Sequence, residues 1–192
     1  QHNLRIAAVV NDYGSVDHDG EVVERDGQTD SVDKLAGGCV CCHGSLGHQL
    51  EEKIGDLLRK PDHAEDRYDY LVIEMSGVSD PETIIRALDK TFGKLTRARL
   101  DSVVAVVDGD YLFHEMKKGE MAVSFQRQLV QADVILLNKA DLLDKEQLAE
   151  LSSSVSCVNS SARITSCSYG QVPLHEVLDI EAPRADIQGV SH

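Results

Sequence analysis

The chain has 192 residues, of which 42% are hydrophobic and 27% charged, and this length and composition are typical of one globular domain with a buried core. Its formal net charge of −14 argues against a nucleic-acid partner, because an acidic surface repels a polyanion. No apolar run reaches the roughly 20 residues of a membrane span, and the N-terminus lacks a signal-peptide pattern, so we expect a cytoplasmic protein with no membrane partner.

The first element along the chain is an apolar run from Leu4 to Val10, which is typical of a buried strand in a parallel sheet. From Asn11 to Asp33 the sequence turns polar and acidic and contains several glycines. We expect this segment to be a mobile loop with a short hairpin.

A cluster of three cysteines, Cys39, Cys41 and Cys42, follows Gly37 and Gly38. Zinc prefers four soft donors at roughly 2.3 Å, so three neighbouring thiolates leave one position to fill. The two glycines tolerate positive φ, which lets the loop wrap the thiolates toward one point. The alternative is that each cysteine is a small buried hydrophobe, but three at this spacing would be an unusual way to fill a core. We interpret the cluster as a Zn²⁺ site.

The cysteine count of five is odd, so the cysteines cannot all pair within the chain. A disulfide between the neighbours Cys41 and Cys42 would close a strained ring. Both observations favour a reducing compartment. The other two cysteines, Cys157 and Cys167, lie in a strand-like segment and a turn, where we expect them to fill the core.

Two amphipathic helices are predicted in the first half of the chain. The later one begins at Pro81, a residue suited to the first helical position, with Asp80 as its N-cap. The earlier helix has an apolar face at helical spacing, formed by Leu46, Leu50, Ile54, Leu57 and Leu58.

Between these helices, the run from Tyr70 to Ile73 predicts a strand that ends in Glu74, with Gly77 three residues later. A carboxylate at a strand end can hold a Mg²⁺-bound water, and a glycine nearby lets a backbone N–H approach a terminal phosphate. The alternative is that Glu74 caps the following loop or pairs with a lysine.

Two further apolar runs, Val103 to Val107 and Val134 to Leu137, predict strands, and Asn138-Lys139-Ala140-Asp141 follows the second directly. An aspartate carboxylate there can accept hydrogen bonds from both N1–H and N2–H₂ of guanine, a pair of donors that adenine lacks. Ligands of open α/β sheets bind at the carboxyl ends of strands. The tetrapeptide therefore indicates a guanine site.

A weaker element follows the segment from Val155 to Val158, which we predict to be a strand. Backbone amides of the turn from Asn159 to Ala162 are candidates for contacting the base, although serine-rich turns are common. The alternation of strands and helices predicts an α/β fold with a mainly parallel sheet flanked by helices. We assign residues 1–178 to this domain and residues 179–192 to a linker or tail.

Taken together, these motifs resemble the CobW family of metal-handling GTPases, which have a P-loop NTPase fold. The Cys-x-Cys-Cys motif before the Glu-x-x-Gly strand separates that family from its nickel-inserting relatives. The segments that carry the resemblance are Asn11-Asp12-Tyr13-Gly14, Gly38-Cys39-Val40-Cys41-Cys42, Glu74-Met75-Ser76-Gly77, Asn138-Lys139-Ala140-Asp141 and Asn159-Ser160-Ser161-Ala162.

The resemblance implies a metal site and a nucleotide site. Zn²⁺ would be bound by Cys39, Cys41 and Cys42, with Asp12 near the metal and His43 as a candidate fourth ligand. In the nucleotide site, a carboxylate and a glycine would sense Mg²⁺ and the γ-phosphate of GTP, and five residues would surround the base. These seven residues are Glu74 and Gly77, then Asn138, Lys139, Asp141, Asn159 and Ala162.

One feature of that family is absent from the 192 residues: the loop Gly-x-x-x-x-Gly-Lys-[Ser/Thr] that cradles phosphates. The pair Gly93-Lys94 is followed by leucine and does not match. We therefore expect a truncated member that lacks its first strand and phosphate loop and has little or no GTPase activity alone. Guanine nucleotide would then be a partner only when the missing segment is supplied.

The function implied by the resemblance is that of a GTP-dependent metallochaperone, which delivers zinc to a client metalloprotein. Two alternatives stay open. One is a nucleotide-independent module for metal binding or client docking. The other is a GTPase that inserts nickel or cobalt, since thiolates do not exclude those metals.

Overall fold

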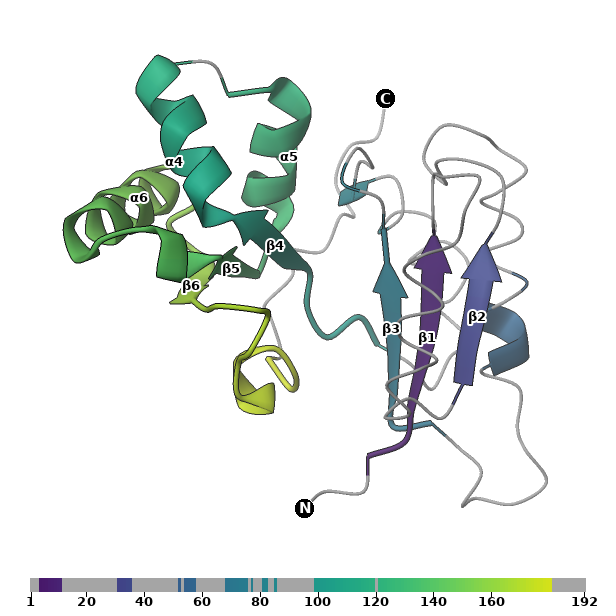
Figure 1. The fold of residues 1–192 in the computed structure, drawn as a ribbon. Coiled ribbons are helices and arrows are strands. Elements are labelled where there is room, and N and C mark those ends of the chain that lie inside the picture. The colour runs from purple at the N-terminus through teal and green to yellow at the C-terminus, as the bar shows by residue number, and fades with distance from the viewer. Residues whose placement is uncertain are drawn as a thin grey trace, which may run out of the picture. The chain divides into compact units, whose positions relative to one another are not determined.

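The computed structural model describes residues 4–11, 31–35, 52, 54–57, 68–75, 77, 81–82, 85, 99–119 and 121–180. The chain divides into two compact units, Gln1–Arg99 and Leu100–His192 (Figure 1). In chain order the elements are β1 (Ile6–Asn11), β2 (Ser31–Leu35), β3 (Tyr70–Glu74), β4 (Val104–Asp108), α4 (Gly109–Lys118), α5 (Val123–Gln131), β5 (Val134–Asn138), η2 (Ala140–Leu142), α6 (Lys145–Val158), β6 (Arg163–Ser166) and η3 (Leu174–Glu176).

The first unit contains a parallel sheet with the strand order β2-β1-β3 (Figure 1). The register places Asn11 opposite Leu35 and Val10 opposite Glu74, so all three strands end at the same edge of the sheet. The central strand β1 is the most apolar, and Ala7 is fully buried within it. Two strands predicted from apolar runs, β1 and β3, are confirmed.

The prediction of a loop with a hairpin was wrong for Ser31 to Asp33. These residues begin β2, and β2 pairs with β1 in the parallel sense, whereas a hairpin needs antiparallel strands. The strand was not predicted because Ser-Val-Asp-Lys-Leu contains no apolar run. Its extended structure is stabilised by the ladder hydrogen bonds to β1. The rest of the predicted loop, residues 12–30, lies outside the described residues.

Helical turns occur in this unit where the sequence predicts two helices. Residues 54–57 are helical, and so are Pro81, Glu82 and Ile85. Ile54, a member of the predicted apolar face, is buried, and so is Ile85 of the later helix. The predicted N-cap, Asp80, lies outside the described residues.

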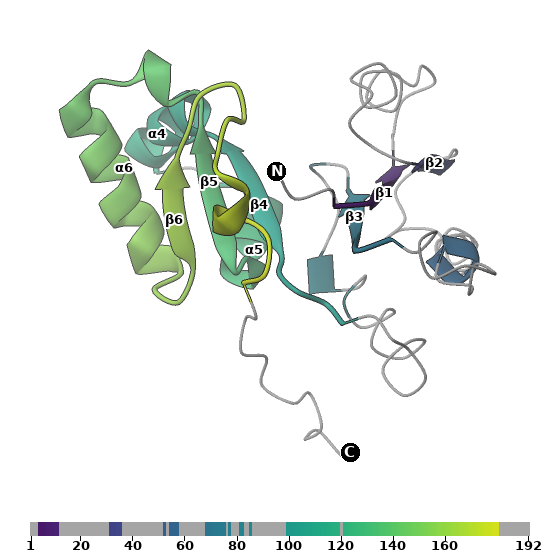
Figure 2. The same ribbon diagram turned by 90° about the horizontal axis from the view of Figure 1, so that it is seen from below.

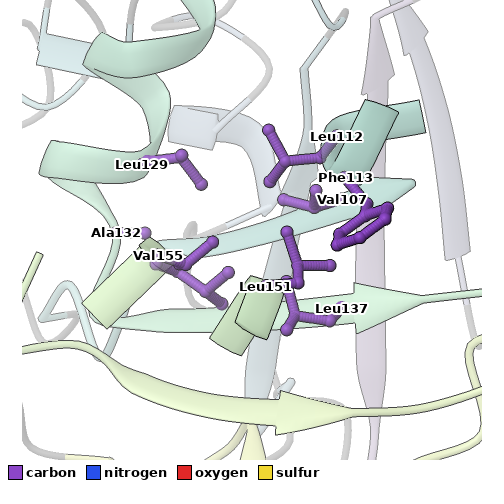
Figure 3. Packing of buried hydrophobic residues seen from close by; sticks show 9 residues of the cluster. Val107, Leu112, Phe113, Leu129, Ala132, Leu137, Leu151 and Val155 are labelled. Atoms are coloured by element: carbon purple, nitrogen blue, oxygen red, sulfur yellow. The ribbon is translucent and has the colours of Figure 1, made fainter. Parts of the chain in front are cut away.

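The second unit contains a parallel sheet with the order β4-β5-β6, and helices α4, α5 and α6 cover one of its faces (Figure 2). The apolar core lies between these helices and the sheet (Figure 3). Its buried members are Val107, Leu112, Phe113, Leu129, Ala132, Ile135, Leu137, Leu151 and Val155. The predicted strands at β4 and β5 are confirmed, whereas helices α4 and α5 were not foreseen in the sequence.

Around β5, the opposite face of the sheet is covered by the C-terminal part of the described chain, whereas Val104 and Val106 of β4 are exposed. Val134 and Leu136 of β5 are buried there against Cys167, with Val172, Val177 and Ile180 packed around them. Ile180 therefore still packs against the sheet, and the boundary assigned after residue 178 stays a prediction. In the part of the chain that the structure describes, no helix is long and apolar enough to cross a membrane.

The segment Val155 to Val158 is helical, so its prediction as a strand was wrong. It forms the last turn of α6, which begins with a capping box in which Asp144 and Gln147 bond reciprocally. Val155 is fully buried one helical turn after Leu151. This helical spacing is not visible within the four residues Val155 to Val158 alone. Cys157 is exposed on this helix, which corrects its assignment to the core, whereas Cys167 is buried as predicted.

Candidate nucleotide-binding site

Three strand ends of the second unit meet at one edge of its sheet. The ladder places Asp108, the last residue of β4, opposite Asn138, the last residue of β5. It also places Leu137 opposite Ser166, the last residue of β6. The chain segments that leave these strands are thereby brought together, which is the usual place for a ligand in an open α/β sheet.

The Asn138 side chain ties the end of β5 to the loop that follows β6. Its Oδ1 accepts a hydrogen bond from the backbone N–H of Gly170 at 3.0 Å. The same oxygen accepts a bond from the Cys167 thiol, with Sγ at 3.6 Å. Burial raises the pKa of this thiol, so it stays protonated and acts as a donor. Asn138 therefore organises the site from inside the protein.

Backbone hydrogen bonds fix the chain on both sides of Asp141. The N–H of Ala140 donates to the carbonyl oxygen of Cys167 at 3.0 Å, and the N–H of Asp141 donates to Oγ of Ser168 at 3.2 Å. The Asp141 side chain is exposed, and within the described part of the chain its carboxylate accepts no hydrogen bond and forms no ion pair. Its backbone is thus held while its two acceptor oxygens stay available.

Lys139 adopts a left-handed backbone conformation with φ of 58°, which is uncommon outside glycine. Its Nζ lies 2.7 Å from Oδ2 of Asp108. This hydrogen bond is the main cause that lowers the pKa of Asp108 and raises the pKa of Lys139, so both groups are charged at neutral pH. The lysine is therefore held by the end of the neighbouring strand.

Gly109 lets β4 and β5 approach closely at this edge. A Cβ added at Gly109 would lie 2.9 Å from the carbonyl oxygen of Asn138, closer than side-chain carbons come in real structures. A residue without a side chain is needed there, directly after Asp108.

The structure does not bring Asn159 and Ala162 to this edge. Asn159 lies before β6, at the opposite end of the sheet, where its Nδ2 donates to the carbonyl oxygens of Leu129, Val130 and Ala132. Its Oδ1 accepts from the backbone N–H of Ala162 at 3.1 Å, and from the N–H and Oγ of Ser161. With the side chain 6% exposed, these bonds occupy both ends of its amide inside the protein.

The loop that does reach the Asn-Lys-x-Asp motif, residues 167–170, was missed in the sequence. The only indication of this loop in the sequence is that it follows β6. That strand is short, and its residues, Arg163 to Ser166, form no apolar run, so it was not predicted. Had that strand been recognised, the rule for strand ends would have indicated this loop instead of the turn from Asn159 to Ala162.

The remaining site predictions concern the first unit. Glu74 is exposed at the end of β3, and Gly77 is exposed as well. Among the described residues, and apart from its chain neighbours, no heavy atom lies within 4 Å of the position that a Cβ on Gly77 would occupy. The predicted zinc ligands and the two residues placed beside them lie outside the described residues: Cys39, Cys41, Cys42, Asp12 and His43. Among the residues that are described, no group of three His, Cys, Asp or Glu side chains is arranged to hold a metal.

A family model described as the CobW/HypB/UreG nucleotide-binding domain matches residues 1–166. The chain belongs to the CobW/HypB/UreG family. The resemblance seen in the motifs is thereby confirmed, and the Asn-Lys-Ala-Asp edge lies within the matched region.

Among curated proteins, "Zinc chaperone YjiA" from Escherichia coli is 30% identical to the chain over 174 residues. The match covers 91% of this chain and 52% of that protein. It is 28% identical over 210 residues to "Zinc-regulated GTPase metalloprotein activator 1" from Dictyostelium discoideum, covering 93% of this chain and 43% of the relative. The chain thus spans about half the length of the relatives it matches.

A solved structure shares the fold. The crystal structure of Zn(II)-bound YjiA GTPase from E. coli aligns with a TM-score of 0.64 at 22% sequence identity, covering 94% of this chain and 54% of the other. At this identity the likeness concerns the fold alone. It confirms the α/β, P-loop NTPase-like class predicted for this member of the CobW/HypB/UreG family.

Proposed function

We propose that this chain is the guanine-reading and zinc-binding part of a GTP-dependent metallochaperone. The observation that carries the proposal is the edge formed by Asn138, Lys139 and Asp141. The loop after β6 holds Asn138 and the Asp141 backbone, and the end of β4 holds the Lys139 side chain, while the Asp141 carboxylate is left without a hydrogen-bond or ion-pair partner among the described residues. A fixed, exposed carboxylate is suited to accept the paired N–H donors of guanine.

The metal half of the proposal rests on topology and on the names of relatives. The parallel register ends β1, β2 and β3 at one sheet edge. In the sequence, Asp12 follows β1 directly, and Cys39 comes four residues after the end of β2 at Leu35. The relatives named as a zinc chaperone and a zinc-regulated GTPase support Zn²⁺ as the metal, which suits a set of three thiolates.

Glu74 ends the third strand at that same edge, opposite Val10. There its carboxylate would hold a Mg²⁺-bound water, and Gly77 would leave room for a terminal phosphate. Replacement of GTP by GDP would then alter the segments that leave this edge, including the cysteine loop, and would release zinc to a client metalloprotein. This route gives the nucleotide control over the metal.

Zinc competition on the reduced chain tests the metal half and its coupling to nucleotide. A chromogenic chelator competes with the wild type, with Cys41→Ser and with Cys157→Ser, a matched control because Cys157 is exposed on α6. We expect Cys41→Ser alone to weaken zinc binding, by roughly tenfold or more for loss of one thiolate. Equal binding by Cys41→Ser and the wild type would rule out the thiolate site.

The same assay is repeated with a non-hydrolysable GTP analogue, GDP or ADP at millimolar concentration, because the 192 residues contain no Gly-x-x-x-x-Gly-Lys-[Ser/Thr] motif and binding through the base edge alone should be weak. We expect guanine nucleotides to shift zinc affinity and ADP to have no effect. Zinc binding that is cysteine-dependent but indifferent to every nucleotide would leave a nucleotide-independent metal module. Competition with nickel and cobalt then identifies the preferred metal.

The base half has its own test in Asp141→Asn. The asparagine keeps one acceptor and introduces an N–H₂ donor, which faces the N2–H₂ of guanine unfavourably but complements the 2-carbonyl oxygen of xanthine. We expect weaker GDP binding and a gain of xanthosine diphosphate binding in NMR titrations of the full chain. If Asp141→Asn binds GDP and xanthosine diphosphate as the wild type does, Asp141 does not read the base.

A further inference from the structure

The Asp108 carboxylate makes two different contacts at the edge that carries the Asn-Lys-x-Asp motif. Its Oδ1 accepts the backbone N–H of Tyr111 at 3.1 Å and so caps the N-terminus of α4. Its Oδ2 lies 2.7 Å from Nζ of Lys139, which is 31 residues away in the sequence. One carboxylate therefore joins the start of a helix to the lysine of the neighbouring strand end.

This carboxylate is held rigidly on its own side. It ends β4 opposite Asn138 in the ladder, it is fixed by the helix cap, and it is followed by Gly109, where an added Cβ would lie 2.9 Å from the Asn138 carbonyl oxygen. Because the Asp108 carboxylate is already held in place, it loses little conformational entropy when it binds an ammonium group. It therefore directs the lysine side chain to a defined position.

Stability alone does not account for the pair. The Asp108 and Lys139 side chains are 37% and 53% exposed, and an exposed ion pair contributes at most about 1 kcal/mol to folding. The pair also bears on where the lysine lies. Two other carboxylates, Asp110 and Asp141, also raise the pKa of Lys139, although less than Asp108 does, so both attract its ammonium group. Without Asp108, the ammonium group would be drawn toward these competitors.

We propose that Asp108 is a positioning residue for guanine recognition: it holds the Lys139 ammonium on the β4 side, which keeps the lysine stem in place beside the base and leaves the Asp141 carboxylate free to accept the base N–H groups. The inference rests on the proposed guanine site. It adds a residue outside the Asn-Lys-x-Asp motif, Asp108, to those on which recognition of the base depends.

The test compares GDP with ADP in NMR titrations of the full chain. In Asp108→Asn the carboxamide oxygen replaces the carboxylate oxygen that caps α4, but the charge that attracts Lys139 is removed. The matched control is Glu115→Gln, which neutralises another carboxylate of α4 and also breaks a lysine pair, that with Lys118 at 2.8 Å. We expect Asp108→Asn to weaken GDP binding roughly three- to tenfold at low salt, and less at high salt because ions screen the pair. Glu115→Gln should bind GDP like the wild type.

A double-mutant cycle with Lys139→Met separates positioning from structural damage. If Asp108 acts through the lysine, Asp108→Asn causes no further loss of GDP affinity when Lys139 is already methionine. Asp108→Glu, which restores the charge, should recover part of the affinity. Equal GDP affinity of Asp108→Asn and the wild type, or the same loss with and without Lys139, overturns the role of Asp108.

The wild type distinguishes that failure from a failure of the proposed function. A wild-type chain that binds GDP more tightly than ADP supports the guanine site, and the variants then decide the role of Asp108. A wild-type chain that shows no preference for GDP even at millimolar nucleotide, where weak binding through the base edge alone should be measurable, overturns the guanine site and the positioning role together.

Discussion

The carboxamide oxygen of Asn138 accepts the backbone N–H of Gly170 at 3.0 Å, which joins the end of β5 to the loop after β6 across 32 residues of sequence. Gly170 has a φ of +66°, a conformation that favours glycine, so the loop turns sharply at the point where Asn138 holds it. The asparagine of the Asn-Lys-x-Asp motif thus has an architectural task, distinct from contact with the base.

Removal of the Asn138 acceptor should loosen this loop. We expect Asn138→Ala to speed hydrogen exchange of the Gly170 amide roughly fivefold, since one hydrogen bond contributes about 1 kcal/mol. Asn138→Asp retains an oxygen in the same place and serves as the matched control, with exchange close to that of the wild type. Exchange is measured by NMR. Equally slow exchange in Asn138→Ala would contradict the tie between the two segments.

Gly109→Ala should destabilise the second unit. Its Cβ would lie 2.9 Å from the Asn138 carbonyl oxygen, and because this neighbour is backbone, the strand end must shift. We expect a loss of about 1–3 kcal/mol in the free energy of unfolding, as in other overpacked sites. Urea denaturation measures it, with Ser156→Ala on the exposed face of α6 as a control that should change little. An unaltered urea midpoint for Gly109→Ala would show that the strand end can yield.

Asn159→Ala should be more damaging, because it removes a buried amide with partners at both ends. The carbonyl oxygen of Ala132 and the N–H of Ala162 would lose their bonds to the amide, and the carbonyl oxygen of Leu129 would keep only the N–H of Ala132, at a cost of about 2–4 kcal/mol in the free energy of unfolding.

The control for Asn159 is its exposed neighbour, Ser160→Ala, which should leave the urea midpoint unchanged. The folded fraction of Asn159→Ala should still bind GDP as the wild type does, since Asn159 lies at the far end of the sheet from Asp141. Loss of GDP binding without loss of stability would instead return Asn159 to the base site.

The contribution of Asp108 to stability should depend on pH in one direction. Its pKa in the folded chain is lowered from the ordinary 3.8, chiefly by the hydrogen bond from Lys139. A lowered carboxyl pKa gives stability that is fully present above the ordinary value and lost as pH falls through the folded value. We therefore expect the small stability advantage of the wild type over Asp108→Asn to be constant near neutral pH and to shrink below pH 3.8.

Urea titrations of both proteins from neutral pH down to about pH 3 measure this difference. Glu115→Gln again provides the comparison, as a carboxylate of the same helix that does not contact Lys139. A gap between the wild type and Asp108→Asn that stays constant, or that widens in acid, would be incompatible with a lowered pKa of Asp108 in the folded chain.

The sequence by itself determined the features that are local. Apolar runs identified β1, β3, β4 and β5, because the strands of parallel sheets typically carry continuous hydrophobic residues. Full burial was not required, since Val72 of β3 and Val106 of β4 are exposed in the structure. The Asn-Lys-Ala-Asp tetrapeptide could be placed at a strand end for the same reason, since it follows such a run directly. The family could also be recognised, because the order of short motifs along the chain requires no knowledge of contacts.

Only the tertiary structure decided what depends on pairing between distant segments. Ser31–Leu35 is a strand because β1 supplies its hydrogen bonds. The helical state of Val155, in contrast, follows from a local signal, the capping box of Asp144 and Gln147 at the start of α6. The Asp108–Lys139 contact and the role of the loop at residues 167–170 arise from the parallel register of β4, β5 and β6. Side chains far apart in sequence become neighbours only when ladder hydrogen bonds align the strand ends, and no local pattern of residues records that alignment.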